Sequence, residues 1–178
     1  VVAKQQELSK PIKWVSTRPF WRYEQVQQGR FREFYQTNID IFGSSDPSAD
    51  AEILAVAADM LTGLGLSAED FDFRVSHRDI LSGLLDSFDA DVDTREAIRT
   101  VDKRAKIDRD EYLSQLQSAG LSLAQAERFD GWLQTDEDDL DELAEASGSE
   151  QVGDAVENLQ NVLSAAEDFG VREYCTVS

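Results

Sequence analysis

Polar and apolar residues alternate through residues 13–43 in two runs, and an alternation with period two is typical of β-strands. The loop 25–30 separates the runs, so the pattern predicts two strands of one hairpin. One predicted face mixes cations, carboxylates, amides and aromatic rings: Phe20, Arg22, Glu24, Arg32, Phe34, Gln36, Asn38 and Asp40. The other carries the apolar set Trp21, Tyr23, Tyr35, Thr37, Ile39 and Ile41. We expect the apolar face to be buried and the mixed face to be a binding surface.

Elements on both sides of the hairpin predict an α+β fold. Residues 1–9 have the pattern of a helix end, and Pro11 disfavours helix at the preceding residue. After a turn at 43–48, apolar residues spaced i, i+3, i+7 and i+11 predict a helix over 49–64, with Ser48 as its cap. Alternation then predicts a half-buried strand at 71–77. This order indicates a mixed or antiparallel sheet with helices.

From residue 79 onward the pattern is helical. Expected helices cover 79–88, 93–104, 108–119, 122–134 and 151–169, and the acidic run 136–145 predicts a weaker helix. Capping boxes mark two starts, at Asp108 and at Ser122. We therefore expect a sheet-containing segment over 1–88, a helical domain over 89–170, and a returning strand over 171–178.

Charge is divided unevenly along the chain. Residues 1–36 hold seven cations and three anions, a net charge of +4, whereas residues 37–178 hold ten cations and thirty-three anions, a net charge of −23. A densely acidic surface keeps a protein hydrated in molar salt, where screening shortens the Debye length to about 3 Å. The sequence thus favours a halophilic protein over a merely acidic one, and a net-positive hairpin favours an anionic ligand there.

Several classes of protein are disfavoured by composition. No apolar run reaches the roughly 18 residues that a membrane span needs, and the polar start does not read as a signal peptide. One cysteine and one histidine, Cys175 and His77, leave no disulfide framework and no zinc cluster, so we expect no metal site and a cytoplasmic setting. The chain opens without Met and ends inside an expected strand, which we interpret as a fragment of a longer protein.

The mixed face of the hairpin suggests chemistry for a phosphorylated ligand. Arg22 and Arg32, one on each strand, can hold phosphate oxygens through charge-assisted hydrogen bonds. Phe34 is placed to stack a planar ring, and Gln36 and Asp40 can accept from an ammonium group or an imidazole N–H. The alternative is a solvated outer face on which Phe34 is an ordinary exposed apolar residue.

The sequence around these residues is similar to that of a known protein family. Residues 20–24, FWRYE, and 29–36, GRFREFYQ, resemble motif 2 of class II aminoacyl-tRNA synthetases. Continued through 37–43 and 49–53, the stretch is similar to the histidyl-tRNA synthetase family, and so are RVSHR at 74–78 and VDKRAKI at 101–107. The resemblance implies part of a class II antiparallel sheet with flanking helices, followed by an all-helical inserted domain, in the archaeal branch of the family.

The resemblance implies roles for hairpin residues in binding ATP. Arg22 matches the catalytic arginine that holds the α-phosphate and the carboxylate end of the amino acid. Glu24 matches the acidic residue near adenine and the tRNA 3′ end. Arg30 and Arg32 match arginines that meet phosphates or the acceptor end, and Phe34 matches the ring that stacks on adenine.

Histidine and tRNA are the other ligands that the resemblance implies. Gln36 matches the glutamine that contacts the α-amino group of histidine, and Asp40 matches an acidic position beside bound histidine. In the loop, Gln28 and Arg30 are expected near tRNA. Three cations spaced i, i+4 and i+7 on one expected helical face could meet the tRNA backbone or pair with acids such as Asp102 and Asp108: Arg99, Lys103 and Lys106.

The implied activity is ATP-dependent ligation of histidine to the acceptor stem of tRNA(His), through a histidyl-adenylate and with Mg²⁺, by a protein that is a homodimer at full length. The chain lacks the family's motifs 1 and 3, so we expect this segment alone to be inactive. One alternative is a non-catalytic synthetase-like regulatory subunit of histidine biosynthesis; another is a plain helical interaction module, which leaves the sorted hairpin unexplained. His77 is expected to be a packed structural residue rather than a catalytic one.

Overall fold

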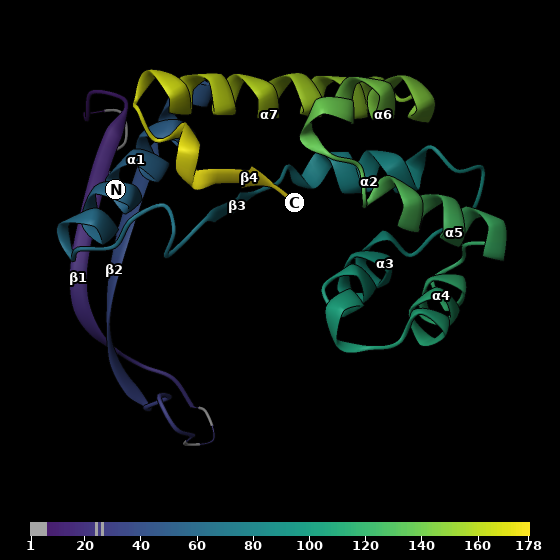
Figure 1. Ribbon diagram of the computed structural model, residues 1–178, viewed down its shortest axis with the longest axis horizontal. Helices are drawn as coiled ribbons and strands as arrows, with labels where there is room; N and C mark the ends of the chain where they lie inside the picture. The colour runs from purple at the N-terminus through teal and green to yellow at the C-terminus, as the bar shows by residue number, and fades with distance from the viewer. Residues whose placement is uncertain (1–6, 24, 26) are drawn as a thin grey trace.

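The computed structural model describes residues 7–23, 25 and 27–178. A long hairpin stands on one side, a group of short helices on the other, and the helix α7 (Glu150–Asp168) crosses between them (Figure 1). Most of the expected helix end at 1–9, and Glu24, lie outside the described residues. Residues 7–9, which are described, form a turn and a bend instead of a helix.

The hairpin consists of β1 (Ile12–Trp21) and β2 (Glu33–Phe42), which pair antiparallel over their full length. Its register sets Phe20 opposite Phe34 and Arg18 opposite Gln36. The mixed face is therefore confirmed as one side of the sheet for its members on the strands, Phe20, Phe34, Gln36, Asn38 and Asp40, whereas Arg22 and Arg32 lie just beyond the strand ends. The prediction that the apolar face is buried is wrong for the end near the loop. There Trp21, Tyr23 and Tyr35 are 73%, 95% and 78% exposed.

Burial differs along that face because α1 (Pro47–Gly63) reaches only one end of it. The Lys13 ammonium lies 2.6 Å from Glu52 of α1, which ties the base of the hairpin to the helix. The start of α1 lies two residues before the expected position. Asp46, not Ser48, is the N-cap: its side chain accepts from the Ser48 amide, and Pro47 supplies a first helical residue that needs no amide partner.

A second pair of strands links distant parts of the chain. β3 (Phe73–Val75) pairs in parallel with β4 (Cys175–Val177), which follows the short 3₁₀ turn η4 (Arg172–Tyr174). The strand expected over 171–178 is therefore present only at 175–177, where it adjoins β3, and residues 172–174 form the 3₁₀ turn instead. In the described residues β3 is not hydrogen-bonded to the hairpin, so the single mixed or antiparallel sheet that the sequence predicted is instead two separate pairs.

The expected helices are present, with ends shifted by a few residues. Between β3 and α7 lie α2 (Arg78–Asp86), α3 (Thr94–Val101), η2 (Arg104–Lys106), α4 (Arg109–Ser118), α5 (Leu123–Trp132), η3 (Glu137–Asp139) and α6 (Leu140–Ser147). The capping box at Ser122 is confirmed in both directions. Between α4 and α5, Gly120 has φ +115°, and a Cβ there would lie 2.4 Å from the Asp91 carbonyl oxygen, so the turn requires glycine.

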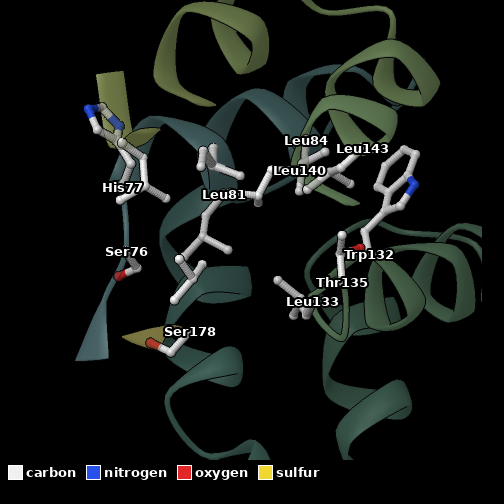
Figure 2. Close-up of a pocket in the computed structure, with 13 residues that line it drawn as sticks. Ser76, His77, Leu81, Leu84, Trp132, Leu133, Thr135, Leu140, Leu143 and Ser178 are labelled. Carbon is white, nitrogen blue, oxygen red and sulfur yellow. The ribbon is translucent and has the colours of Figure 1, made fainter. Parts of the chain in front are cut away.

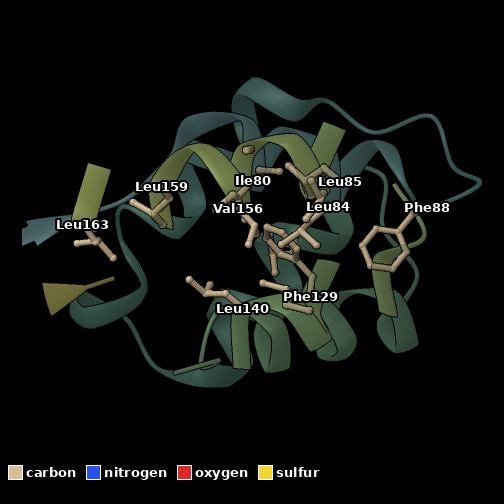
Figure 3. Packing of buried hydrophobic residues seen from close by; sticks show 14 of the residues in the cluster. Ile80, Leu84, Leu85, Phe88, Phe129, Leu140, Val156, Leu159 and Leu163 are labelled. Atoms are coloured by element: carbon tan, nitrogen blue, oxygen red, sulfur yellow. The ribbon is translucent and has the colours of Figure 1, made fainter. Parts of the chain in front are cut away.

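The core lies among these helices and not beneath the hairpin. Leu84 from α2, Phe129 from α5 and Val156 from α7 meet in it, with at most 2% of each residue exposed (Figure 3). α7 packs along α1 and α2, and so joins the predicted helical domain to the preceding segment. The domain boundaries given by the sequence remain a prediction.

Candidate functional site

The structure brings Arg22 and Phe34 together on the mixed face of the hairpin. The guanidinium carbon of Arg22 lies 5.1 Å from the centre of the Phe34 ring, within cation–π range. Phe20, directly across the strand pair, stacks on Phe34 with ring centres 6.3 Å apart and an interplanar angle of 24°. Phe34 is half-buried. Phe34 is therefore not the ordinary exposed phenylalanine of the alternative, because its ring contacts both Arg22 and Phe20.

Further along β2, Gln36 is held in place by a neighbour on the same face. Its amide nitrogen donates to the Asn38 side-chain oxygen over 2.6 Å. Arg18 is opposite Gln36 in the register and adds a cation that the sequence analysis did not include in the mixed face. Period two within β1 was enough to place Arg18, two residues before Phe20, on this face, and the strand pairing adds that its partner is Gln36.

Asp40 is separate from this group. It is six residues beyond Phe34, which at about 3.3 Å per residue places it roughly 20 Å away along the strand. It is exposed at the base of the hairpin, and it lines an apolar cavity of about 270 Å³ between the hairpin and α1, together with Trp14, Ile39 and Ile53. The sequence grouped Gln36 and Asp40 on one face, and the structure puts them at different points along it.

The loop end of the hairpin carries the other predicted residues. Arg32 lies with its guanidinium 5.3 Å from the Tyr23 ring. The tip is a tight turn in which the Arg30 amide donates to the Gln27 carbonyl over 3.0 Å, with Gly29 at φ +79°. Gln28 and Arg30 are exposed there. The predicted role of Glu24 falls outside the described residues.

The three helical cations do not share one helical face as the sequence predicted. α3 ends at Val101 with Asp102 as its C-cap, so Lys103 and Lys106 belong to the turn and to η2 rather than to the helix. Arg99 pairs with Glu96 of its own helix, Nη1 to Oε2 3.4 Å, and not with Asp102 or Asp108. The prediction is wrong because it assumed a helix through residue 104, whereas α3 ends at Val101, between Arg99 and Lys103.

A charged cluster in the helical region was not predicted. Asp130 on α5 has only 3% of its surface exposed, and both of its carboxylate oxygens are bonded. Arg104 donates from Nε to Oδ1 over 2.9 Å, and Arg109 donates from Nε to Oδ2 over 3.3 Å. Burial, and then the Asp130 charge, raise the pKa of the nearby Tyr112 to about 12. The sequence separations of 26 and 21 residues hide this cluster from any local pattern.

A small cavity of about 60 Å³ lies between α2, α5 and α6, beside β3 and β4. Figure 2 shows that leucines and Trp132 line it, and that the His77 ring is turned away from them. The ring instead caps α2, because its Nδ1 accepts from the Asp79 amide over 3.2 Å. His77 therefore has a structural part as the N-cap of α2 rather than as a ring packed among apolar residues, and its lack of a catalytic role stays a prediction.

Within the part of the chain that the structure describes, no group of three His, Cys, Asp or Glu residues is arranged to hold a metal ion. No helix in that part has the length and apolar character needed to span a membrane.

Comparison with known proteins gives a consistent family. A family model described as histidyl-tRNA synthetase matches residues 1–177. A histidine–tRNA ligase from the haloarchaeon Haloarcula marismortui is 72% identical over 177 residues, which are 99% of this chain and 41% of that protein. The chain thus spans about two fifths of the length of the relative it matches.

Solved structures give the same fold at low sequence identity. Histidyl-tRNA synthetase from Nostoc sp. PCC 7120 superposes with a TM-score of 0.84 at 21% identity, over 99% of this chain and 42% of that one. A Bacillus halodurans C protein titled ATP phosphoribosyltransferase regulatory subunit/histidyl-tRNA synthetase superposes with a TM-score of 0.77 at 21% identity, over 99% of this chain and 45% of that one. At this identity the likeness concerns the fold alone.

Proposed function

The chain belongs to the histidyl-tRNA synthetase family, and we propose that the complete protein activates histidine with ATP and transfers it to tRNA(His). The observation that carries the proposal is the Arg22–Phe34 pair, which joins a phosphate-binding cation to a stacking ring within 5.1 Å. An adenine nucleotide needs both groups close together, because its base and its α-phosphate are joined through one ribose.

In the proposed first step, a carboxylate oxygen of histidine attacks the α-phosphorus of ATP. The bond from that phosphorus to the bridging oxygen of pyrophosphate breaks, and pyrophosphate leaves. Negative charge builds up on the phosphorus oxygens, where the Arg22 guanidinium stabilises it, and no side chain has to exchange a proton. In the second step a ribose hydroxyl at the 3′ end of tRNA attacks the histidyl carbonyl, the bond from that carbon to the phosphate oxygen breaks, and AMP leaves with the hydroxyl proton on its phosphate.

Positions along the hairpin suggest how the ligands are arranged. Phe34 stacks adenine and Gln36 meets the α-amino group of histidine, while Arg18 opposite Gln36 adds positive charge for a carboxylate. Asp40 lies at the base of the strand, far from Arg22 and Phe34. We therefore assign it to the side chain of the bound histidine rather than to the phosphate. The exposed tip with Gln28 and Arg30, together with Arg32, is available to the acceptor end of tRNA.

Magnesium and dimer formation are further parts of the proposal. Mg²⁺ would be held largely by phosphate oxygens of ATP and would supply positive charge for the departing pyrophosphate, so it does not require a dedicated cage of protein ligands. The complete protein is proposed to be a homodimer. Arg99, Lys103 and Lys106 remain candidates for contact with the tRNA backbone.

The largest effect is expected from Arg22→Ala in the complete protein. Removal of a cation aimed at developing charge costs about 10²–10³-fold in rate, so histidine-dependent exchange of pyrophosphate into ATP should fall by that factor. Arg74→Ala is the matched control, because Arg74 is exposed on β3 and its one ion pair among the described residues is with Asp72. Full activity in Arg22→Ala would refute the assigned part. A complete lack of histidine-dependent exchange in the parent protein would favour the regulatory-subunit alternative.

A second variant tests the adenine contact. Phe34→Leu keeps an apolar side chain but removes the ring, and stacking is worth about 0.5–1.5 kcal/mol, so KM for ATP should rise about 2–10-fold with KM for histidine little changed. Tyr35→Leu is the control, since Tyr35 is the next residue and lies on the opposite face. Equal effects in both variants would show that strand packing, and not adenine, is being measured.

A further inference from the structure

Asn38 is a residue of the mixed face to which the proposed function gives no part. It lies on β2 two residues beyond Gln36, opposite Ser16 in the register, and it is half-buried. The Gln36 amide nitrogen donates to its Oδ1 over 2.6 Å. Among the described residues this is the one side-chain hydrogen bond that either amide makes. The contact with Asn38 therefore decides how the Gln36 amide is turned.

The two ends of the Gln36 amide differ in what they can bind. The nitrogen of such an amide carries two N–H donors, whereas the oxygen is an acceptor with two lone pairs. An ammonium group has only donors, so it binds the oxygen and is repelled by the nitrogen. With Nε2 of Gln36 turned to Asn38, Oε1 is the end that remains for a ligand. Gln36 can then accept a hydrogen bond from the α-amino group that the proposed function assigns to it.

Charged residues on both sides favour this orientation of the two amides. Asp40 is the next residue beyond Asn38 on the mixed face, and its carboxylate attracts the Asn38 amide nitrogen, which leaves Oδ1 for Gln36. Arg18 is opposite Gln36, and its guanidinium attracts Oε1 and repels Nε2. The hydrogen bond between the amides thus lies between an anion and a cation, with both amide dipoles aligned in the field of the two charges.

We propose that Asn38 is a positioning residue for histidine, which holds the Gln36 amide with its oxygen toward the α-amino group of the substrate. Asn38 itself does not touch histidine. It acts by disfavouring the alternative in which Gln36 turns its nitrogen to the ammonium group. The inference rests on the proposed function, because Gln36 meets an α-amino group only if an amino acid is the substrate.

A hydrogen bond that only stiffens β2 is the structural alternative, and the hairpin offers a matched example of one. Thr17 and Thr37 are opposite each other in the register, and their hydroxyl oxygens lie 3.0 Å apart in a hydrogen bond. This bond also joins two neutral side chains, but it lies on the other face of the strand pair. Thr37→Val therefore measures what the loss of one such bond does to the hairpin alone.

The test is histidine-dependent exchange of pyrophosphate into ATP by the complete protein. Asn38→Leu removes the acceptor at similar size, so KM for histidine should rise about 2–10-fold, the effect of one neutral hydrogen bond, with KM for ATP unchanged. Asn38→Asp keeps an acceptor in a side chain of the same shape and should return KM for histidine to the parent value or below. Thr37→Val should leave both constants unchanged.

A ligand without an ammonium group separates positioning from a general change in the site. Imidazolepropionate is histidine without its α-amino group, and its inhibition constant is measured in the same assay. Asn38→Leu should leave that constant unchanged. Combined with Gln36→Leu, it should add no further loss in KM for histidine, because Asn38 acts through Gln36.

The positioning role would be overturned by imidazolepropionate weakened as much as histidine, by losses that add to those of Gln36→Leu, or by an equal effect of Thr37→Val. A KM in Asn38→Asp as high as in Asn38→Leu would also overturn it. If the parent protein is active and Asn38→Leu leaves KM for histidine unchanged, this inference fails and the proposed function stands. If the parent protein shows no histidine-dependent exchange, the proposed function fails and this inference with it.

Discussion

The hairpin and the helical region differ in how far their large apolar and aromatic side chains are buried. In the helical region, residues from α2, α4, α5 and α7 bury one another, and Phe129, Leu116 and Val152 are almost inaccessible to solvent. On the hairpin, aromatic residues of comparable size are left exposed: Trp21, Tyr23 and Tyr35. The helical residues thus bury one another, whereas one face of the hairpin is covered by described residues only at its base.

The hairpin and the helical region also differ in charge and in where the proposed ligand-binding residues lie. The hairpin is held by cross-strand pairing and by few contacts with α1, and it carries the net-positive charge of the first 36 residues. The helical region is strongly acidic, and five of its cations fall within residues 99–109. Most of the proposed ligand-binding residues therefore lie along the exposed strand pair and not within the buried helical core.

The strongest test of this difference is to truncate one large side chain to alanine in each region. Phe129→Ala removes a fully buried ring and should lower the free energy of unfolding by about 3–5 kcal/mol. Tyr35→Ala removes a ring that is 78% exposed and should change it by about 0.5 kcal/mol or less. Urea unfolding followed by circular dichroism measures both. Similar losses in the two variants would mean that the hairpin is covered in solution by something that this chain does not contain.

The same contrast explains which parts of the fold could be predicted from the sequence. Helices were predictable because their signals are local: a 3.6-residue period and caps such as Ser122 with Gln125. The two faces of the hairpin were also predictable, from period two. Burial of its apolar face was not, since burial depends on what packs there, and α1 covers only the end near Lys13 and Ile41.

Contacts between distant residues were the other limit. The parallel pairing of Phe73 with Cys175 and the bonds from Arg104 and Arg109 to Asp130 join residues far apart in sequence. No period within one segment encodes them. For the candidate site, the order of Arg22, Phe34 and Gln36 along the hairpin was enough to group them, but the distance of Asp40 from that group follows only from the length of the strand.

The pH dependence of stability tests the burial of Tyr112 in the helical region. Below pH 10 the Tyr112 phenol is neutral in the folded and the unfolded chain. Between pH 10 and about 12 the unfolded chain releases the proton while burial keeps it on the folded chain, so stability falls as the pH rises and the loss is complete above about 12. At 1.36 kcal/mol for each pH unit, we expect a loss of about 2–3 kcal/mol.

Tyr112→Phe isolates this effect from the other groups that titrate at alkaline pH. The difference in free energy of unfolding between the parent chain and the variant should change by that amount across the window, and it should be constant below pH 9–10, roughly the range where tyrosine stays protonated. A difference that is flat throughout would show that Tyr112 is as accessible to solvent as the hairpin tyrosines.

The smallest expected effect concerns the link between the two regions. The Lys13–Glu52 pair is partly exposed, with 56% and 30% of the side chains accessible, and exposed pairs contribute about 0.2–1 kcal/mol. A double-mutant cycle with Lys13→Gln and Glu52→Gln, monitored by thermal unfolding, should give a coupling in that range at low salt. In about 1 M KCl the Debye length is near 3 Å, so the coupling should become smaller. A coupling that is unchanged in molar KCl would mean that the base of the hairpin is a buried contact, and that the two regions are less separate than their exposed surfaces indicate.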